Sequence, residues 1–200
     1  MCAPRATSTA SASVRSRLRA CDERLLLLAR TRAHRPRRDR AVARFSRLGE
    51  HGAIWIVLGA GGALVDAPRA SAWRRAASTV AGVYVLNTSI KLVVRRRRPI
   101  LPGYPPLTGT QTALSFPSAH AATALAAARL YSGLGLPRVP LYLLAGAFAY
   151  SRLYLGVHYP SDVLAGALMG TLVAHAAGGT APSAVGAPGT SAPPPAEASR

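Results

Sequence analysis

The chain has 200 residues, of which half are hydrophobic and only 16% are charged, so its composition is unlike that of an ordinary soluble domain. Its net charge of +18 is concentrated near the N-terminus, because residues 1–50 hold 13 of the 24 arginines. A basic block of this kind can bind nucleic acid or an anionic membrane surface, and the apolar segments that follow it favour the membrane.

The N-terminal quarter of the chain divides into two regions. Residues 1–21 are rich in Ser, Ala and Arg, a composition that predicts disorder. Residues 22–50 mix Leu, Ala and Arg around Pro36 and predict one or two basic amphipathic helices at a membrane surface. A solvated basic arm is the alternative for this region. The apolar run at 25–29 is too short for the core of a signal peptide, so we expect no cleaved signal.

Five apolar segments follow, and they predict an all-α, integral-membrane bundle of about five transmembrane helices. Their Ala and Gly residues allow membrane helices to approach closely. Most of them fall slightly short of the roughly 20 residues that a helix needs to cross a bilayer, so a compact soluble helical bundle is the alternative. The catalytic domain is expected over 51–177, before a Pro/Gly/Ala-rich tail at 178–200 that cannot build a core. The segments cover residues 52–66, 76–94, 119–136, 138–155 and 162–177.

Three polar clusters interrupt these apolar segments, and the first is KLVVRRRRP at residues 91–99. Pro99 should end the helix near Arg98, which leaves Lys91, the only lysine of the chain, one to two turns inside the helix. A cation inside a membrane helix is costly and requires an anionic partner. The arginines at 95–97 are explained by a positively charged anchor on the cytoplasmic side, a role that does not explain the deeper lysine.

The second cluster is SFPSAH at residues 115–120. Pro117 is a helix start signal, so Ser118 and the backbone N–H groups after it should face outward from a helix N-terminus. Such a terminus is a ready binding site for an anion. His120 falls in the same first turn. Taken alone, the motif also fits a capped helix that carries an incidental histidine.

The third cluster is SRLYLGVHYPSDVLAG at residues 151–166, and its Asp162 is the only acidic residue within residues 67–196. Pro160 indicates a helix start, which places Asp162 in the first turn, where a carboxylate suits the helix dipole. From there Asp162 can reach back to His158, fix its tautomer and free its other ring nitrogen. Taken alone, this cluster also fits a capping aspartate beside an unrelated histidine.

Helices that alternate in direction would bring all three clusters to one face of the bundle. The cations Lys91, Arg98 and Arg152 would then surround two helix N-termini, two histidines and one aspartate. This arrangement suits an oxyanion held beside a nucleophile and an acid. A metal site would need three or four ligands, and the cations would repel a divalent ion, so we predict no metal. Cys2 and Cys21 form neither a disulfide framework nor a metal knuckle.

The three clusters resemble the three-part signature of the type 2 phosphatidic acid phosphatase superfamily, which also contains vanadium haloperoxidases. The signature spans residues 91–162, and the helical context extends the resemblance to about 50–177. Ala119 stands where the family often has Gly, another small residue. The matching motifs are Lys91-x6-Arg98-Pro99, Pro117-Ser118-Ala119-His120 and Ser151-Arg152-x5-His158-x3-Asp162.

The resemblance implies a phosphatase that needs neither metal nor cofactor. It implies that His158 attacks phosphorus and forms a phosphohistidine, with Asp162 orienting and polarising the imidazole. His120 would protonate the leaving oxygen and then help to activate water. The phosphoryl oxygens would be bound by Lys91, Arg98, Ser118 and Arg152.

A site at the membrane face suits a lipid phosphate, so the expected partners are a lipid-phosphate substrate and the membrane rather than nucleic acid. The small size and the Arg-rich N-terminal region resemble family members that act on decaprenyl-phosphoribose phosphate, a cell-wall precursor. Undecaprenyl pyrophosphate, phosphatidic acid and phosphatidylglycerol phosphate are the alternative substrates. A vanadium haloperoxidase would use the same pocket for vanadate, but those enzymes are soluble and larger. A non-catalytic membrane- or nucleic-acid-binding protein would explain the basic N-terminus but not the motifs.

The distribution of arginines also predicts an orientation. Their concentration in the N-terminal region places the N-terminus in the cytoplasm of a multi-pass plasma-membrane protein. With five spans, the catalytic face would then be cytoplasmic and the C-terminal tail would lie outside.

Overall fold

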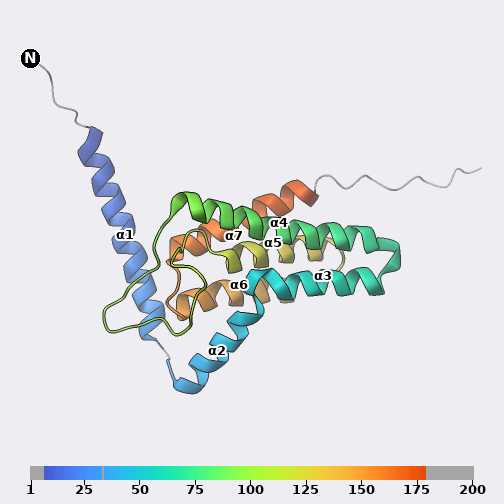
Figure 1. Ribbon diagram of the computed structural model, residues 1–200, viewed down its shortest axis with the longest axis horizontal. Coiled ribbons are helices and arrows are strands. Elements are labelled where there is room, and N and C mark those ends of the chain that lie inside the picture. The colour runs from blue at the N-terminus through green and yellow to red at the C-terminus, as the bar shows by residue number, and fades with distance from the viewer. Residues whose placement is uncertain (1–6, 33, 179–200) are drawn as a thin grey trace, which may run out of the picture.

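The computed structural model describes residues 7–32 and 34–178, and the regular structure within these ranges is helical (Figure 1). The predicted all-α class is therefore confirmed for this part of the chain. The α-helices are α1 (Thr7–Thr31), α2 (Pro36–Leu48), α3 (Ala53–Val65), α4 (Ala70–Val94), α5 (Ala119–Gly133), α6 (Arg138–Tyr154) and α7 (Pro160–Gly178). The 3-10 turns η1 (Glu50–Gly52) and η2 (Ala67–Arg69) precede α3 and α4.

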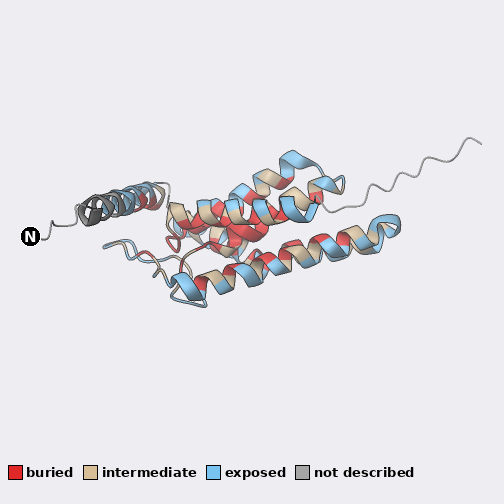
Figure 2. Ribbon diagram, turned by 90° about the horizontal axis from the view of Figure 1, so that it is seen from above, coloured by how far each residue is buried: buried red, intermediate tan, exposed pale blue. Residues whose placement is uncertain are grey.

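Helix α5 forms the centre of the bundle and packs against α3, α4, α6 and α7 (Figures 1 and 2). Six of its seven alanines are buried, and such small side chains let neighbouring backbones come close. Two glycines of α7, Gly166 and Gly170, make the closest approach. A Cβ atom at either position would collide with a backbone carbonyl oxygen, of Ser118 and Ala122 respectively. These glycines therefore bring the start of α7 against the start of α5.

The five predicted apolar segments correspond to α3 to α7, with small shifts at their ends. The largest shift is at α4, which begins at Ala70 rather than at residue 76. Among the described residues, one helical stretch, Ala67–Val94, has the length and hydropathy to cross a bilayer by itself. The bent pair Pro36–Leu48 and Glu50–Val65 meets the same criteria only when its two helices, inclined at 43°, are taken together. The number of membrane spans stays a prediction.

The N-terminal region differs from our expectation. Helix α1 begins at Thr7, so residues 7–21 are helical where we predicted disorder. Their Ala, Arg and Leu residues favour helix, and this preference prevails over the polar composition from which we inferred disorder. Pro36 occupies the first turn of α2, so the chain breaks near the proline as predicted. Residues 1–6 and the tail at 179–200 lie outside the described residues.

Candidate active site

The three polar clusters meet in one pocket at the end of the bundle where α4 and α6 end and α5 and α7 begin. The convergence predicted from alternating helices is therefore observed. Two of the predicted residues, Ser118 and Asp162, are fully buried behind the residues that line the pocket. The predicted residues that line the pocket are Lys91, Arg98, His120, Arg152 and His158.

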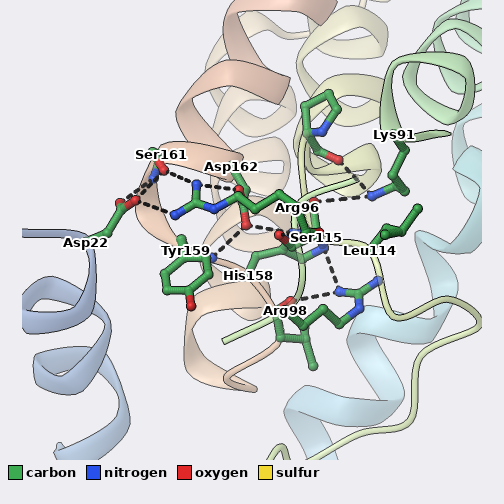
Figure 3. A network of polar contacts seen from close by, with 12 residues as sticks. Asp22, Lys91, Arg96, Arg98, Leu114, Ser115, His158, Tyr159, Ser161 and Asp162 are labelled. Atoms are coloured by element: carbon green, nitrogen blue, oxygen red, sulfur yellow. Dashed lines mark hydrogen bonds and ion pairs between the residues drawn. The ribbon is translucent and has the colours of Figure 1, made fainter. Parts of the chain in front are cut away.

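His158 lies in the turn between α6 and α7, with each ring nitrogen facing a charged group (Figure 3). Its Nε2 is 3.1 Å from Nη1 of Arg98, and its Nδ1 is 3.5 Å from Oδ2 of Asp162, slightly beyond hydrogen-bond length. Burial lowers the pKa of His158 well below its ordinary value, and the charges of Arg152, Arg98 and Lys91 lower it further. The imidazole is therefore neutral, with a lone pair available for attack.

The Asp162 carboxylate is held from two directions. Its Oδ2 accepts the backbone N–H of Tyr159 at 2.9 Å, and its Oδ1 pairs with Nη1 of Arg96, also at 2.9 Å. A fully buried carboxylate needs such partners, because an unpaired buried charge is strongly destabilising. The pair fixes the orientation of the carboxylate toward His158.

Arg96 is a site residue that the sequence analysis missed, since we assigned residues 95–97 to a surface anchor. Arg95 caps α4 in the left-handed conformation, with φ 54°, and Arg97 then forms an isolated antiparallel β-bridge with Leu114. Side chains alternate in extended chain, so Arg96 and Arg98 turn inward while Arg95 and Arg97 are exposed. Helix α4 ends at Val94 rather than near Arg98 as Pro99 predicted, so Arg96 lies outside the helix where we expected it inside, and no sequence signal marked it.

Lys91 and Arg98 line the pocket, and each donates hydrogen bonds to backbone carbonyl oxygens of neighbouring segments. The ammonium group of Lys91 donates to the carbonyl oxygens of Ser115 and Pro117, at 3.2 and 2.9 Å, so its partners are backbone dipoles rather than the expected anion. Arg98 Nη1 donates to the Val157 carbonyl at 2.7 Å. Burial lowers the pKa of Arg98 to about 10, so it stays charged at neutral pH. Both cations face the pocket.

His120 and Arg152 share a partner on α2 that the sequence analysis did not single out. The Nε2–H of His120 donates to the Ser46 carbonyl at 2.9 Å, because a carbonyl can only accept. Nη1 of Arg152 donates to the hydroxyl of the same serine at 2.6 Å. Ser46 therefore contacts a predicted catalytic residue and a predicted phosphate-binding residue, although it lies in the region where we predicted membrane-surface helices.

The start of α5 differs in detail from the prediction. The helix begins at Ala119, two residues after Pro117, and Ser118 is its N-cap residue without a side-chain capping bond. The N–H of Ser118 donates to the Asp162 carbonyl at 2.9 Å, so it does not face the pocket as we expected. The first N–H groups of α5 itself have no partner within the helix. Ala119 and His120 line the pocket, which leaves this helix terminus as the candidate anion site.

In residues 7–32 and 34–178, no three His, Cys, Asp or Glu side chains are grouped closely enough to hold a metal ion. Apart from Glu50, the charged groups that line the pocket are cations, and they lie beside a helix N-terminus. These are the groups that stabilise a phosphoryl group during transfer.

The comparisons with known proteins agree with this arrangement. Residues 72–179 match the PAP2 superfamily. A Mycolicibacterium smegmatis protein named decaprenylphosphoryl-5-phosphoribose phosphatase is 43% identical over 122 residues, which cover 60% of this chain and 67% of that protein.

Two solved structures share the fold. Aquifex aeolicus LpxE matches with a TM-score of 0.66 and 28% identity, over 77% of this chain and 92% of that one. A transmembrane PAP2-type phosphatidylglycerolphosphate phosphatase from Bacillus subtilis matches with a TM-score of 0.65 and 22% identity, over 81% of this chain and 85% of that one. By its matched residues, its relatives and its fold, this chain belongs to the PAP2 superfamily and is a phosphatase.

Proposed function

We propose that this chain is a metal-independent lipid phosphatase of the plasma membrane, acting on decaprenylphosphoryl-5-phosphoribose through a phosphohistidine at His158. One observation carries the chemistry: the imidazole of His158 lies between the Asp162 carboxylate and the Arg98 guanidinium, at 3.5 and 3.1 Å. The name of the Mycolicibacterium smegmatis relative supports the substrate.

In the first step, Nε2 of His158 attacks phosphorus, so a P–N bond forms and the bond from phosphorus to the leaving oxygen breaks. Asp162 stabilises the positive charge that develops on the imidazole, from the side of Nδ1. His120 gives the leaving oxygen its proton. The cations Lys91, Arg98 and Arg152 stabilise the negative charge on the equatorial oxygens.

In the second step, water attacks the phosphohistidine. His120, now without its extra proton, takes a proton from the water as the new P–O bond forms. The P–N bond breaks, and its electron pair returns to Nε2 of His158. Inorganic phosphate leaves, and the proton that His120 took from the water leaves it ready for the next cycle.

The outward-facing side chains support the membrane location. Large apolar residues are exposed along four helices of the bundle, while the buried residues of α5 are mostly alanines. A soluble protein rarely exposes so much apolar surface to water. In a membrane, lipid tails would cover this surface. We propose that α3 to α7 cross the membrane. The exposed residues include Val57 and Leu64 on α3, Val85, Leu92 and Val93 on α4, Leu143 on α6, and Leu164, Leu168 and Leu172 on α7.

The rim of the pocket supports a substrate with a polar group next to its phosphate. His51 Nε2 lies 2.9 Å from Oε1 of Gln111, and the ring of Tyr84 meets His51 edge to face, at 5.2 Å between ring centroids. Glu50 also lines the pocket. Hydroxyl groups of a ribose can donate and accept hydrogen bonds with such side chains, whereas the diacylglycerol part of phosphatidic acid has no hydroxyl group to donate.

The decisive experiment measures phosphate release from decaprenylphosphoryl-5-phosphoribose in detergent with EDTA present. The protein is compared with His158→Ala and with a matched control, His175→Ala, in which an exposed histidine of α7 is removed. We expect release by the protein and by the control, and none by His158→Ala. Equal release by His158→Ala would exclude His158 as the nucleophile.

A second measurement separates the substrates. Phosphatidic acid, phosphatidylglycerol phosphate and undecaprenyl pyrophosphate are assayed beside the ribose-containing lipid, and we expect kcat/KM to be highest for that lipid. A higher value for one of the others would replace the substrate and retain the chemistry. Quenching a turnover of ³²P-labelled substrate in alkaline detergent should trap a phosphohistidine that is stable in alkali and labile in acid.

A further inference from the structure

We propose that Asp22, on the N-terminal helix α1, is a positioning residue for the catalytic pair of His158 and Asp162 and acts on the pair through Arg96. The inference rests on the catalytic roles proposed above. It goes beyond the family match, which begins at residue 72 and does not include α1. It also replaces our expectation that the N-terminal region is a membrane-surface element only.

Helix α1 docks on the catalytic end of the bundle through one face. Asp22, Leu26 and Arg30 are buried and spaced four residues apart, so they lie on one side of the helix, while most of the described residues between them are exposed. The guanidinium of Arg30 donates to the carbonyl oxygens of Tyr154 and Pro105, at 3.0 and 2.7 Å. This end of α1 is thereby fastened to the turn that leads to His158.

Asp22 contacts the first turn of α7, next to the catalytic carboxylate. Its Oδ1 accepts the backbone N–H of Ser161 at 2.9 Å, and its Oδ2 accepts the Ser161 hydroxyl. The N–H is one of those that a helix start leaves without a partner, and a carboxylate there also suits the helix dipole. Asp22 therefore caps α7 from another helix, one residue away from Asp162.

Arg96 joins Asp22 to Asp162 (Figure 3). Its Nη2 is 2.8 Å from Oδ2 of Asp22, and its Nη1 is 2.9 Å from Oδ1 of Asp162. Nη1 also donates to the Ser161 hydroxyl at 2.6 Å, and the guanidinium stacks over the Tyr159 ring at 4.1 Å from its centroid. A planar guanidinium held at both ends has little freedom to rotate, so it fixes the Asp162 carboxylate.

The charges give Asp22 a second effect. Arg96 carries one positive charge, and two carboxylates share it. Without Asp22, the whole positive charge of Arg96 would act on Asp162. It would then offset the negative charge that the Asp162 carboxylate presents to Nδ1 of His158. Asp22 thus keeps Asp162 both oriented and effective in stabilising the imidazolium that forms during attack.

The test compares Asp22→Asn, which keeps the shape and removes the charge, with Glu23→Gln. Glu23 is the exposed neighbour on the same helix and lines a pocket together with Arg96, so its variant makes the same change of net charge nearby without removing the ion pair between Asp22 and Arg96. We expect Asp22→Asn to lower kcat by about 10- to 100-fold with KM nearly unchanged, as is typical when a supporting hydrogen bond behind a reactive group is lost. Glu23→Gln should match the unaltered protein, and Asp22→Glu should recover part of the loss.

A spectroscopic readout separates positioning from folding. In protein with ¹⁵N-labelled histidine, the Nδ1 and Nε2 shifts of His158 report its tautomer, and Asp22→Asn should reduce the share protonated at Nδ1. Unaltered kcat in Asp22→Asn would overturn the proposal. A loss of kcat that parallels a loss of thermal stability, with the His158 tautomer unchanged, would also overturn it. An Asp22→Asn variant that no longer folds would do the same, because in both cases the role of Asp22 would be structural. Activity that survives His158→Ala would instead refute the proposed function itself.

Discussion

At the scale of single residues, the site depends on a histidine whose two nitrogens have different tasks. Nε2 of His158 faces the cations that would hold the phosphoryl group, and Nδ1 faces Asp162 at 3.5 Å. That contact is slightly longer than a hydrogen bond, as is common in catalytic sites without substrate. We expect it to shorten when a phosphoryl group binds and charge develops on the ring.

The low pKa of His158 leads to a first prediction. Because burial and neighbouring cations lower this pKa, the folded protein keeps the ring neutral below pH 6.5, where an unfolded chain would take up a proton. Stability is therefore full above pH 6.5 and is lost as the pH falls below it. A pH titration of ¹⁵N-labelled histidines in detergent, with His158→Gln to identify the resonance, should give a midpoint below 6.5. A midpoint at or above this value would contradict the prediction.

The role of His120 gives a second prediction at this scale. His120→Ala should lower kcat for a lipid phosphate by about 10²- to 10⁴-fold, because an alkoxide is a poor leaving group without a proton. The loss should be much smaller with para-nitrophenyl phosphate, whose leaving group needs no proton. Steady-state assays of both substrates with one protein preparation test this. An equal loss on both would indicate that His120 acts in a step that both substrates share, such as activation of water, rather than by protonating the leaving group.

At the scale of elements, the geometry depends on how closely α7 approaches α5. Gly166 lies against the backbone of Ser118, and the N–H of Ser118 donates to the Asp162 carbonyl at 2.9 Å. The contact between these helices therefore sets the position of Asp162 and of the turn that carries His158. The same motif residues on a looser helix pair would not meet.

The third prediction follows from this contact. Gly166→Ala should destabilise the fold by at least about 1–3 kcal/mol, the usual cost of overpacking, and should lower kcat, because a Cβ would push α7 away from α5. Gly146→Ala on α6 is the matched control, since a Cβ there meets no atom within 4 Å. Thermal unfolding and activity are measured in detergent for both. Unchanged activity in Gly166→Ala would show that the site tolerates a shift of α7.

At the scale of the whole molecule, the pocket and the basic helices share one end of the bundle. Ser46 of α2 contacts His120 and Arg152, while Asp22 of α1 pairs with Arg96. The Arg-rich N-terminal region therefore lies on the same side as the site. Because arginine-rich segments stay on the cytoplasmic side, we expect the site to face the cytoplasm.

The fourth prediction tests this orientation. A single cysteine at position 105, an exposed site in the loop before α5, is introduced after Cys2 and Cys21 have been replaced. A membrane-impermeant thiol reagent should label it in opened membranes and not in intact cells. Labelling in intact cells would place the active site on the outer face and reverse the orientation.

The sequence by itself determined the helical class, the approximate extents of α3 to α7 and the motif residues that line the pocket. These features have local signals: apolar runs of helical length, prolines at helix starts, and polar residues isolated among apolar ones. Lys91, His120 and His158 could be selected in this way because each stands out from its neighbours.

Only the tertiary structure decided which groups support those residues. Ser46, Arg96 and Asp22 act through contacts with partners 65 to 139 residues away in the chain, and no periodicity or spacing marks them. Arg96 stands in a run of four arginines, and the turn at Arg95 decides which of them face the site. Asp22 lies in the region that predicted membrane-surface helices, so its role depends on the docking of α1, a long-range interaction that burial and ion pairing stabilise.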